Sequence, residues 1–377
     1  MRLHHAGAVS ALVLLAGGET VAQTTINPDI TVIPRFLVVT DDGQKLDEGT
    51  REFSTPDLQF QEMEIGLQGY LNPYARADIF LAVKGPDLES ISLGLEEAYL
   101  TILRGLPLDL NVRLGKYRVE FGKLNTLHPH AWPFVSQPLV QGRFLGEEGL
   151  NDLGVSLSTL VPTGEVYTKL TLDLLRGASV GEAAGMEDTT DGAMPYAASG
   201  RLSSFFTLGS STDLEVGLSA LTGIHDPYEH ERFWYGNLDF KLKTRPDSYT
   251  SFTVQGEFLV NTRSAAASSA GEPFLDGEGN PESRRITTGG AYLFADYQFE
   301  KIFDVGARLD WSESPTGADE RTRGFALFFG YYPVEETVGL RLEYQHLLTE
   351  SAGTTQSVNV IGLQVMFSLG PHRAHAF

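Results

Sequence analysis

The stretch FDVGARLDW at residues 303–311 alternates between apolar and polar side chains. Its apolar members are Phe303, Val305, Ala307, Leu309 and Trp311. The charged residues Asp304, Arg308 and Asp310 occupy positions between them. Because successive side chains of a β-strand point to opposite faces, an extended chain here has one apolar face and one charged face. The stretch therefore predicts a β-strand that lies between an apolar medium and water.

The same two-residue period continues through most of the chain, and helical periodicity is scarce. The alternating segments are about 10–14 residues long, which exceeds the ~5–6 typical of globular strands and suits strands that tilt through a bilayer. We predict about 16 strands, an even number, as in bacterial single-chain barrels. They cover residues 30–40, 58–71, 73–84, 89–103, 106–118, 151–161, 164–176, 197–208, 212–224, 231–243, 248–262, 286–299, 301–312, 322–332, 336–349 and 357–369.

The connections between these segments alternate between tight turns and long polar loops. The tight turns, rich in Pro, Gly, Asn and Asp, lie at 72–73, 104–107, 162–164, 245–247 and 333–335. The long loops lie near 41–57, 119–150, 177–196, 263–285 and 313–321. This alternation predicts an all-β fold, a transmembrane antiparallel β-barrel with long external loops and both chain ends in the periplasm. A soluble propeller or sandwich is the alternative, but no blade-like repeat of about 40–50 residues is visible.

The composition narrows the class of protein further. Hydrophobic residues make up 42% of the 377 residues, which is too few for a helical membrane protein and suits a barrel. The absence of cysteine excludes disulfides, thiolate metal ligands and a cysteine nucleophile. The net charge of −21 argues against nucleic acid as a partner and permits the attraction of cations.

Both ends of the chain carry features of exported barrels. Arg2, an apolar run at 6–15 and the small residues before Gln23 predict a signal peptide over residues 1–22, which leaves the barrel at 23–377. The alternative is a membrane anchor, which needs about 20 apolar residues. The chain ends on Phe377 after an amphipathic strand, and this resembles the signal read by the barrel-assembly machinery of the outer membrane. We expect residues 370–377 to form a short periplasmic tail.

The connection at 119–150 is the longest and the least like a flexible polar loop. It contains Phe121, Trp132, Phe134 and Phe144 together with three prolines. A loop this apolar would be sticky in water. We therefore expect this third external loop, called the inward loop below, to fold into the lumen and narrow it.

A family resemblance supports this organisation. The runs FQEMEIGLQGYLNPYARADIFLA (60–82), EEAYLTIL (96–103) and the segment 115–158, with its HPHxW core at 128–132 and GRFLGEEGLND at 142–152, carry it. The chain resembles a family of Gram-negative outer-membrane proteins often labelled zinc-regulated TonB-dependent outer-membrane receptors, and its architecture resembles that of porins. The resemblance implies an outer-membrane barrel and suggests a link to zinc supply.

The inward loop also carries the candidate site residues. His128 and His130 are candidate zinc ligands if Glu147, Glu148 or Asp152 supplies a third. The alternative is a rigid turn that packs Trp132 and hydrogen-bonds both imidazoles. A further histidine pair, His372 and His375, lies in the C-terminal tail, where a disordered end is the alternative. The expected constriction residues are Lys123, His128, His130, Trp132, Arg143, Glu147 and Glu148, with anchoring of the loop as the alternative role.

Charged residues on the polar face of the strands should point into the lumen. By alternation they include Glu62, Glu64, Arg76, Asp78, Asp109, Arg113, Asp239, Lys241, Arg308, Asp310, Arg341 and Glu343. Acids outnumber bases along this face in the sequence, so a mild cation preference follows for a water-filled pore. The alternative is a lumen closed by salt bridges.

These features predict a porin-like channel for passive diffusion of small polar solutes or ions. No nucleophile elbow or phosphate loop is visible, so we expect no enzymatic activity. The alternatives are a binding or receptor barrel linked to zinc uptake, or a structural or adhesive barrel. We expect outer-membrane lipid and lipopolysaccharide as surroundings, a homotrimer as the assembly, and no cofactor other than zinc.

Overall fold

The computed structural model describes most of the chain. It covers residues 28–43, 45–46, 50–51, 53–85, 90–177, 179, 197–226, 231–265, 273–280, 282–334, 337–351 and 353–371. The predicted signal peptide at 1–22, the tail beyond Pro371 with its two histidines, and Phe377 lie outside these residues.

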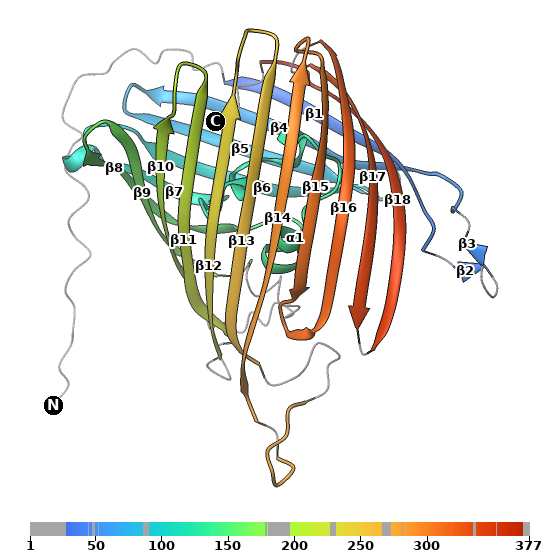
Figure 1. Cartoon of the computed structure of the whole chain (residues 1–377). Helices are drawn as coiled ribbons and strands as arrows, with labels where there is room; N and C mark the ends of the chain where they lie inside the picture. Colours follow the sequence, from blue (N-terminus) through green and yellow to red (C-terminus); the bar gives the residue numbers. More distant parts are fainter. Residues whose placement is uncertain are drawn as a thin grey trace, which may run out of the picture.

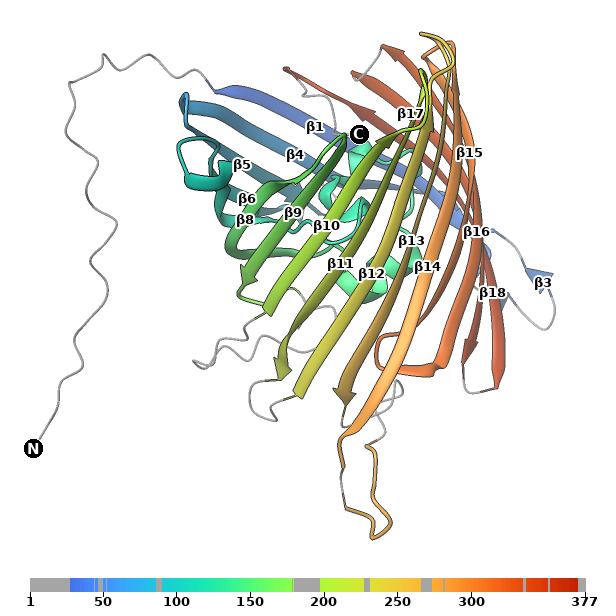
Figure 2. The same ribbon diagram turned by 60° about the vertical axis from the view of Figure 1, so that its left-hand side comes forward.

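Sixteen antiparallel strands form one closed barrel (Figures 1 and 2). They are β1 (Asp29–Asp41), β4 (Asp57–Asn72), β5 (Ala75–Lys84), β6 (Ser92–Ile102), β7 (Asn111–Arg118), β8 (Asn151–Thr163), β9 (Val166–Leu175), β10 (Ala197–Thr207), β11 (Thr212–Asp226), β12 (Glu231–Thr244), β13 (Ser251–Ala265), β14 (Arg284–Phe299), β15 (Phe303–Ser314), β16 (Gly317–Val334), β17 (Val338–Ser351) and β18 (Thr354–Phe367). Neighbours in sequence are neighbours in the barrel, and β1 pairs with β18 to close it. A separate two-stranded sheet, β2 (Lys45–Leu46) with β3 (Thr50–Arg51), lies in the first long loop.

The predicted fold class and strand number are confirmed, because each predicted segment overlaps one observed strand. Two details of the prediction were wrong. The strand expected at 106–118 begins only at Asn111, because a 3-10 turn, η1 (Pro107–Asp109), precedes it. Asp109 is therefore an exposed turn residue and does not face the lumen from a strand. The long loop expected at 313–321 is a short turn, because β15 and β16 continue as a ladder in which Ser314 pairs with Gly317.

The two faces of the wall differ as the alternation predicts. In β12, Tyr235 and Asp239 are 2% and 1% exposed, whereas Trp234 and Leu238 are 55% and 54% exposed. A barrel needs an apolar outer face to lie in lipid, and closure satisfies the backbone groups that lipid cannot hydrogen-bond. Within the described part of the chain, no helix has the length and apolar character needed to cross a bilayer.

Aromatic side chains gather at the end of the barrel where the short turns lie. Phe303 stacks against Phe299 and Tyr331, with ring centroids 5.4 and 5.1 Å away. Exposed tyrosines near the same turns are Tyr70, Tyr74, Tyr167, Tyr249 and Tyr297. Such a girdle is typical of a membrane interface. The described chain ends meet at this end too, where Val32 and Leu369 exchange two backbone hydrogen bonds of 2.9 Å.

The inward loop lies inside the barrel, as predicted, and carries η2 (Leu124–Thr126), η3 (Pro129–Ala131) and α1 (Leu139–Leu145). Its side chains Phe121, Phe134, Val140, Phe144 and Leu150 are fully buried. They form one apolar cluster with wall residues of β11, β12, β13, β14 and β16, namely Leu221, Phe233, Tyr235, Leu259, Tyr292, Phe294 and Phe328. The apolar composition of the loop is thus accounted for by a core within the lumen.

Candidate functional site

Glu257 on β13 holds the beginning of the inward loop. Its carboxylate accepts hydrogen bonds from the backbone N–H groups of Lys123 and Leu124, at 3.0 and 2.6 Å. It also accepts hydrogen bonds from the side chains of Gln141, Asn237 and Tyr292. A buried carboxylate that satisfies five donors is a strong anchor, because each donor would otherwise lose its partner. The two-residue period of β13 puts Glu257 on the lumen face, but no signal in the sequence identifies its partners.

The middle of the loop is held by residues of β15 and β17. Glu343 accepts a hydrogen bond of 2.9 Å from Val135 N and contacts Ser136. Arg308 donates to Ser136 O at 2.7 Å and lies over the ring of Phe134, 4.3 Å from its centroid. Asp310 accepts from Leu139 N, and Arg341 donates to His130 O at 2.8 Å. These four predicted lumen residues therefore bind the loop.

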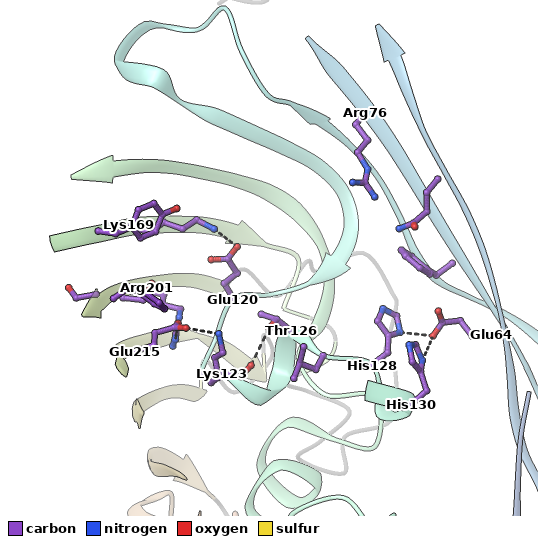
Figure 3. Close-up of a pocket in the computed structure, with 18 of the residues that line it drawn as sticks. Glu64, Arg76, Glu120, Lys123, Thr126, His128, His130, Lys169, Arg201 and Glu215 are labelled. Carbon is purple, nitrogen blue, oxygen red and sulfur yellow. Dashed lines mark hydrogen bonds and ion pairs between the residues drawn. The ribbon is translucent and has the colours of Figure 1, made fainter. Parts of the chain in front are cut away.

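Lys123 and Arg143, predicted as constriction residues, contact the wall through ion pairs. Lys123 Nζ lies 2.6 Å from Glu215 on β11 (Figure 3). Arg143 donates to Ser312 O and to Thr322 Oγ1, and pairs with Glu320 at 3.1 Å. Their geometry matches the alternative role of anchoring the loop.

Glu147 and Glu148 lie near the long-loop end. The carboxylate of Glu148 pairs with Lys84 on β5. The backbone carbonyl oxygen of Glu148 accepts a hydrogen bond of 2.8 Å from Arg118 Nη1. Both glutamates line a cavity of about 550 Å³ together with Lys84 and Lys116. Asp152 instead accepts hydrogen bonds from Leu153 N and Gly177 N. The expectation that one of these three acids supplies a further ligand was wrong, because the carboxylate that lies beside both histidines is that of Glu64 on β4.

The remaining predicted lumen residues lie on the inner face. Glu62, Glu64, Asp78 and Asp239 are buried, and Arg76, Arg113 and Lys241 are half-buried. Several pair with each other or with neighbours, as in the ion pair of Arg35 with Glu62 at 3.3 Å. The wall is therefore charged, and ion pairs neutralise part of this charge. Acidic side chains outnumber basic ones among the buried charged residues of the described chain.

His128 and His130 meet a different carboxylate, Glu64 of β4 (Figure 3). His128 Nδ1 lies 2.9 Å from Glu64 Oε2, and His130 Nδ1 lies 3.3 Å from the same oxygen. The two imidazole rings stack with centroids 5.6 Å apart. Burial lowers the pKa of His128, but the charges of the surrounding carboxylates outweigh it and hold the pKa well above its usual value. A histidine pair separated by one proline is thus held at one wall of the barrel.

Glu96 and Glu97 on β6 complete these surroundings, and the sequence reasoning missed them. Under strict alternation one of the two side chains would face the lipid, yet both are buried, at 4% exposure. A β-bulge explains this, because Phe80 pairs with Glu97 while Leu81 pairs with Leu95 and leaves Glu96 as the extra residue. Two adjacent glutamates in an alternating strand were the available signal.

Trp132 lies between two cavities of the lumen. One, of about 260 Å³, reaches the short-turn end and is lined by Lys301, Asp304 and Tyr332. The other, of about 370 Å³, lies on the other side of the loop and is lined by Arg35, Glu147 and Glu343. Trp132 borders both and is 6% exposed. The indole therefore lies at the boundary between two cavities of the barrel.

A comparison with protein families finds no matching family model. An uncharacterised protein of Aquifex aeolicus (strain VF5) is 28% identical over 402 residues, covering 94% of this chain and 81% of its own.

Solved structures share the architecture. The anion-selective porin of Comamonas acidovorans superimposes with a TM-score of 0.58 at 10% identity, covering 91% of this chain and 100% of its own. The outer-membrane channel DcaP of Acinetobacter baumannii gives 0.57 at 13% identity, with 94% and 100% covered. OmpT of Vibrio cholerae in its trimer form gives 0.53 at 10% identity, with 91% and 99% covered.

At these identities the likeness shows the fold. The chain has the porin-like fold of Gram-negative outer-membrane barrels, and its apolar outer face is that of a barrel that lies in this membrane. Trimeric forms occur among the structural neighbours. None of these comparisons supports the label of TonB-dependent receptor, and 22 strands, not 16, form the barrels of such transporters.

Proposed function

We propose that the protein is a porin-like channel through which small polar solutes or ions diffuse passively across the outer membrane. The observation that supports the proposal is the position of the inward loop. The loop is held inside a 16-strand barrel and leaves cavities on both of its sides. Barrels of this size enclose an aqueous lumen, and a loop held across it sets the size of what passes.

We expect a mild preference for cations. The motivation is the excess of acidic over basic side chains among the buried charged residues and the net charge of −21. Rings of carboxylates lower the free energy of cations in a pore and raise that of anions. Ion pairs such as Arg201 with Asp239 cancel part of this field, so the preference should be weak.

Purified protein in a planar lipid bilayer should produce stable conductance steps in KCl. Under a KCl gradient, the reversal potential should have the sign of a weakly cation-selective pore. A membrane that stays silent with correctly folded protein would contradict the channel. An anion-selective reversal potential would contradict only the preference.

Truncation of Trp132 should widen the pore. In Trp132→Ala, the two cavities that the indole separates should merge, because a large buried side chain is lost where both end. We expect a clear rise in single-channel conductance, smaller than that caused by loss of the whole loop. Trp234→Ala, on the lipid face, is the matched control and should leave conductance unchanged. Equal conductance in the two variants would show that Trp132 does not limit flow.

The other expectations stay predictions. They are the homotrimer, the contacts with lipopolysaccharide and the assembly machinery, and the absence of enzymatic activity. Size-exclusion chromatography with light scattering in detergent tests the first of them directly.

A further inference from the structure

We propose that Glu64, His128 and His130 form a binding site for one divalent transition-metal ion of the zinc type, which links the inward loop to strand β4. The three ligand atoms, Glu64 Oε2 and the Nδ1 atoms of both histidines, lie within 4.8 Å of one another. One carboxylate and two imidazoles are a donor set that zinc commonly uses.

The spacing of these atoms suits a tetrahedral ion. Zinc–ligand bonds of about 2.0–2.2 Å at tetrahedral angles place neighbouring ligand atoms roughly 3.3 Å apart. Glu64 Oε2 lies 2.9 Å from His128 Nδ1 and 3.3 Å from His130 Nδ1. Glu96 Oε2, a further carboxylate, lies 3.7 Å from His128 Nδ1. Small side-chain rotations would therefore bring the donors around one ion.

Unsatisfied buried atoms converge at the same point. Glu64 Oε2, Glu96 Oε2 and His128 Nδ1 are buried and make no hydrogen bond, although the contacts between them are short. Glu64 is 3% exposed and Glu96 is 4% exposed. Burying such atoms without a partner costs free energy, and a bound cation would recover it. This convergence points to a ligand.

A second carboxylate, that of Glu97, contacts the other ring nitrogen of His128 and orients the imidazole for metal binding. His128 Nε2 lies 2.7 Å from Glu97 Oε1, so the Nε2–H can stay hydrogen-bonded to Glu97 while a bound ion replaces the proton on Nδ1. Glu97 is itself held by Arg118 N at 3.0 Å. A carboxylate behind a metal-bound histidine is the usual second contact of zinc sites.

The position of the site gives the ion open coordination sites. Glu64, His128 and His130 all line a cavity of about 540 Å³ that also contains Arg76 and Lys169. Three protein ligands leave at least one position for water, so the ion should exchange with the solution. The metal would stabilise the docked loop by its binding free energy, because the loop and the wall each contribute ligands.

Titration of the folded full-length barrel in detergent with zinc tests the site. Isothermal calorimetry should show one zinc per chain, and cobalt should give the visible absorption of a tetrahedral site with imidazole ligands. Glu64→Gln and the double change His128→Ala with His130→Ala should abolish both signals. Glu97→Gln should weaken binding by about 10–100-fold.

Glu343→Gln is the matched control, because this carboxylate also holds the loop but lies at Val135 and Ser136. It should retain zinc binding. Circular dichroism confirms that each barrel is folded, and the isosteric Glu64→Gln decides the result if the double variant does not fold. If the wild-type barrel binds no zinc, the proposal is wrong, and Glu64, His128 and His130 form a cluster of ion pairs only. Equal affinity in wild type and Glu64→Gln would also overturn the proposal.

Discussion

Replacement of residues 120–149 by an Asn-Gly turn is expected to produce the largest conductance of any variant. Val119 N donates to Leu150 O at 2.9 Å, so the two strands β7 and β8 already face each other where the loop leaves them. Adjacent strands joined by two residues form an ordinary hairpin, for which Asn-Gly is the favoured sequence. The sixteen-strand ladder is then complete without the loop, and the lumen loses its only described crossing segment.

The same deletion should lower thermal stability without opening the barrel. Wall residues such as Phe233, Phe294 and Phe328 lose the apolar partners that now bury them. Each large apolar side chain returned to water costs about 1.5–3 kcal/mol. Single-channel recordings and a melting curve followed by circular dichroism measure the two effects. An unchanged conductance in a folded deletion variant would show that the loop does not restrict flow.

The strands could be predicted because their signals are local. Alternation and turn chemistry depend only on neighbouring residues, so stretches such as 303–311 indicate their own conformation. The inward position of 119–150 also followed from its own composition, since four aromatic residues need burial. The error at Asp109 arose where Pro107 starts a 3-10 turn within a segment that alternates only by chance.

The partners of the loop could not be predicted because they depend on closure of the barrel. Glu64 and His128 are separated by 64 positions, and Val135 and Glu343 by 208. Which acid meets which histidine is decided by strand register and by the bulge at Glu96, and neither appears in a two-residue period. Glu147, Glu148 and Asp152, the acids that follow the histidines in the sequence, were therefore the wrong choice.

Loss of the Glu257 carboxylate is expected to release the inward loop while the barrel stays folded. In Glu257→Ala, the backbone N–H groups of Lys123 and Leu124 lose their acceptor, as does the amide of Gln141. A buried donor without a partner costs about 1–3 kcal/mol, so the two backbone donors alone weaken docking by on the order of 2–6 kcal/mol. Since each 1.4 kcal/mol is tenfold, the undocked population should rise by at least about tenfold.

The barrel should stay folded after this change, because the substitution removes only a side chain and keeps the backbone pairing of β13 with β12 and β14. Limited proteolysis should cleave within 119–150 in Glu257→Ala and spare the wild type, and recordings should show larger, noisier conductance. Glu257→Gln is the control, because its remaining carbonyl oxygen can still accept from Lys123 and Leu124, while its amide faces the donors of Gln141 and Asn237. It should give an intermediate result. Protection of the loop in Glu257→Ala equal to that in the wild type would contradict this role of Glu257 and leave Arg308 and Glu343 as the anchors of the loop.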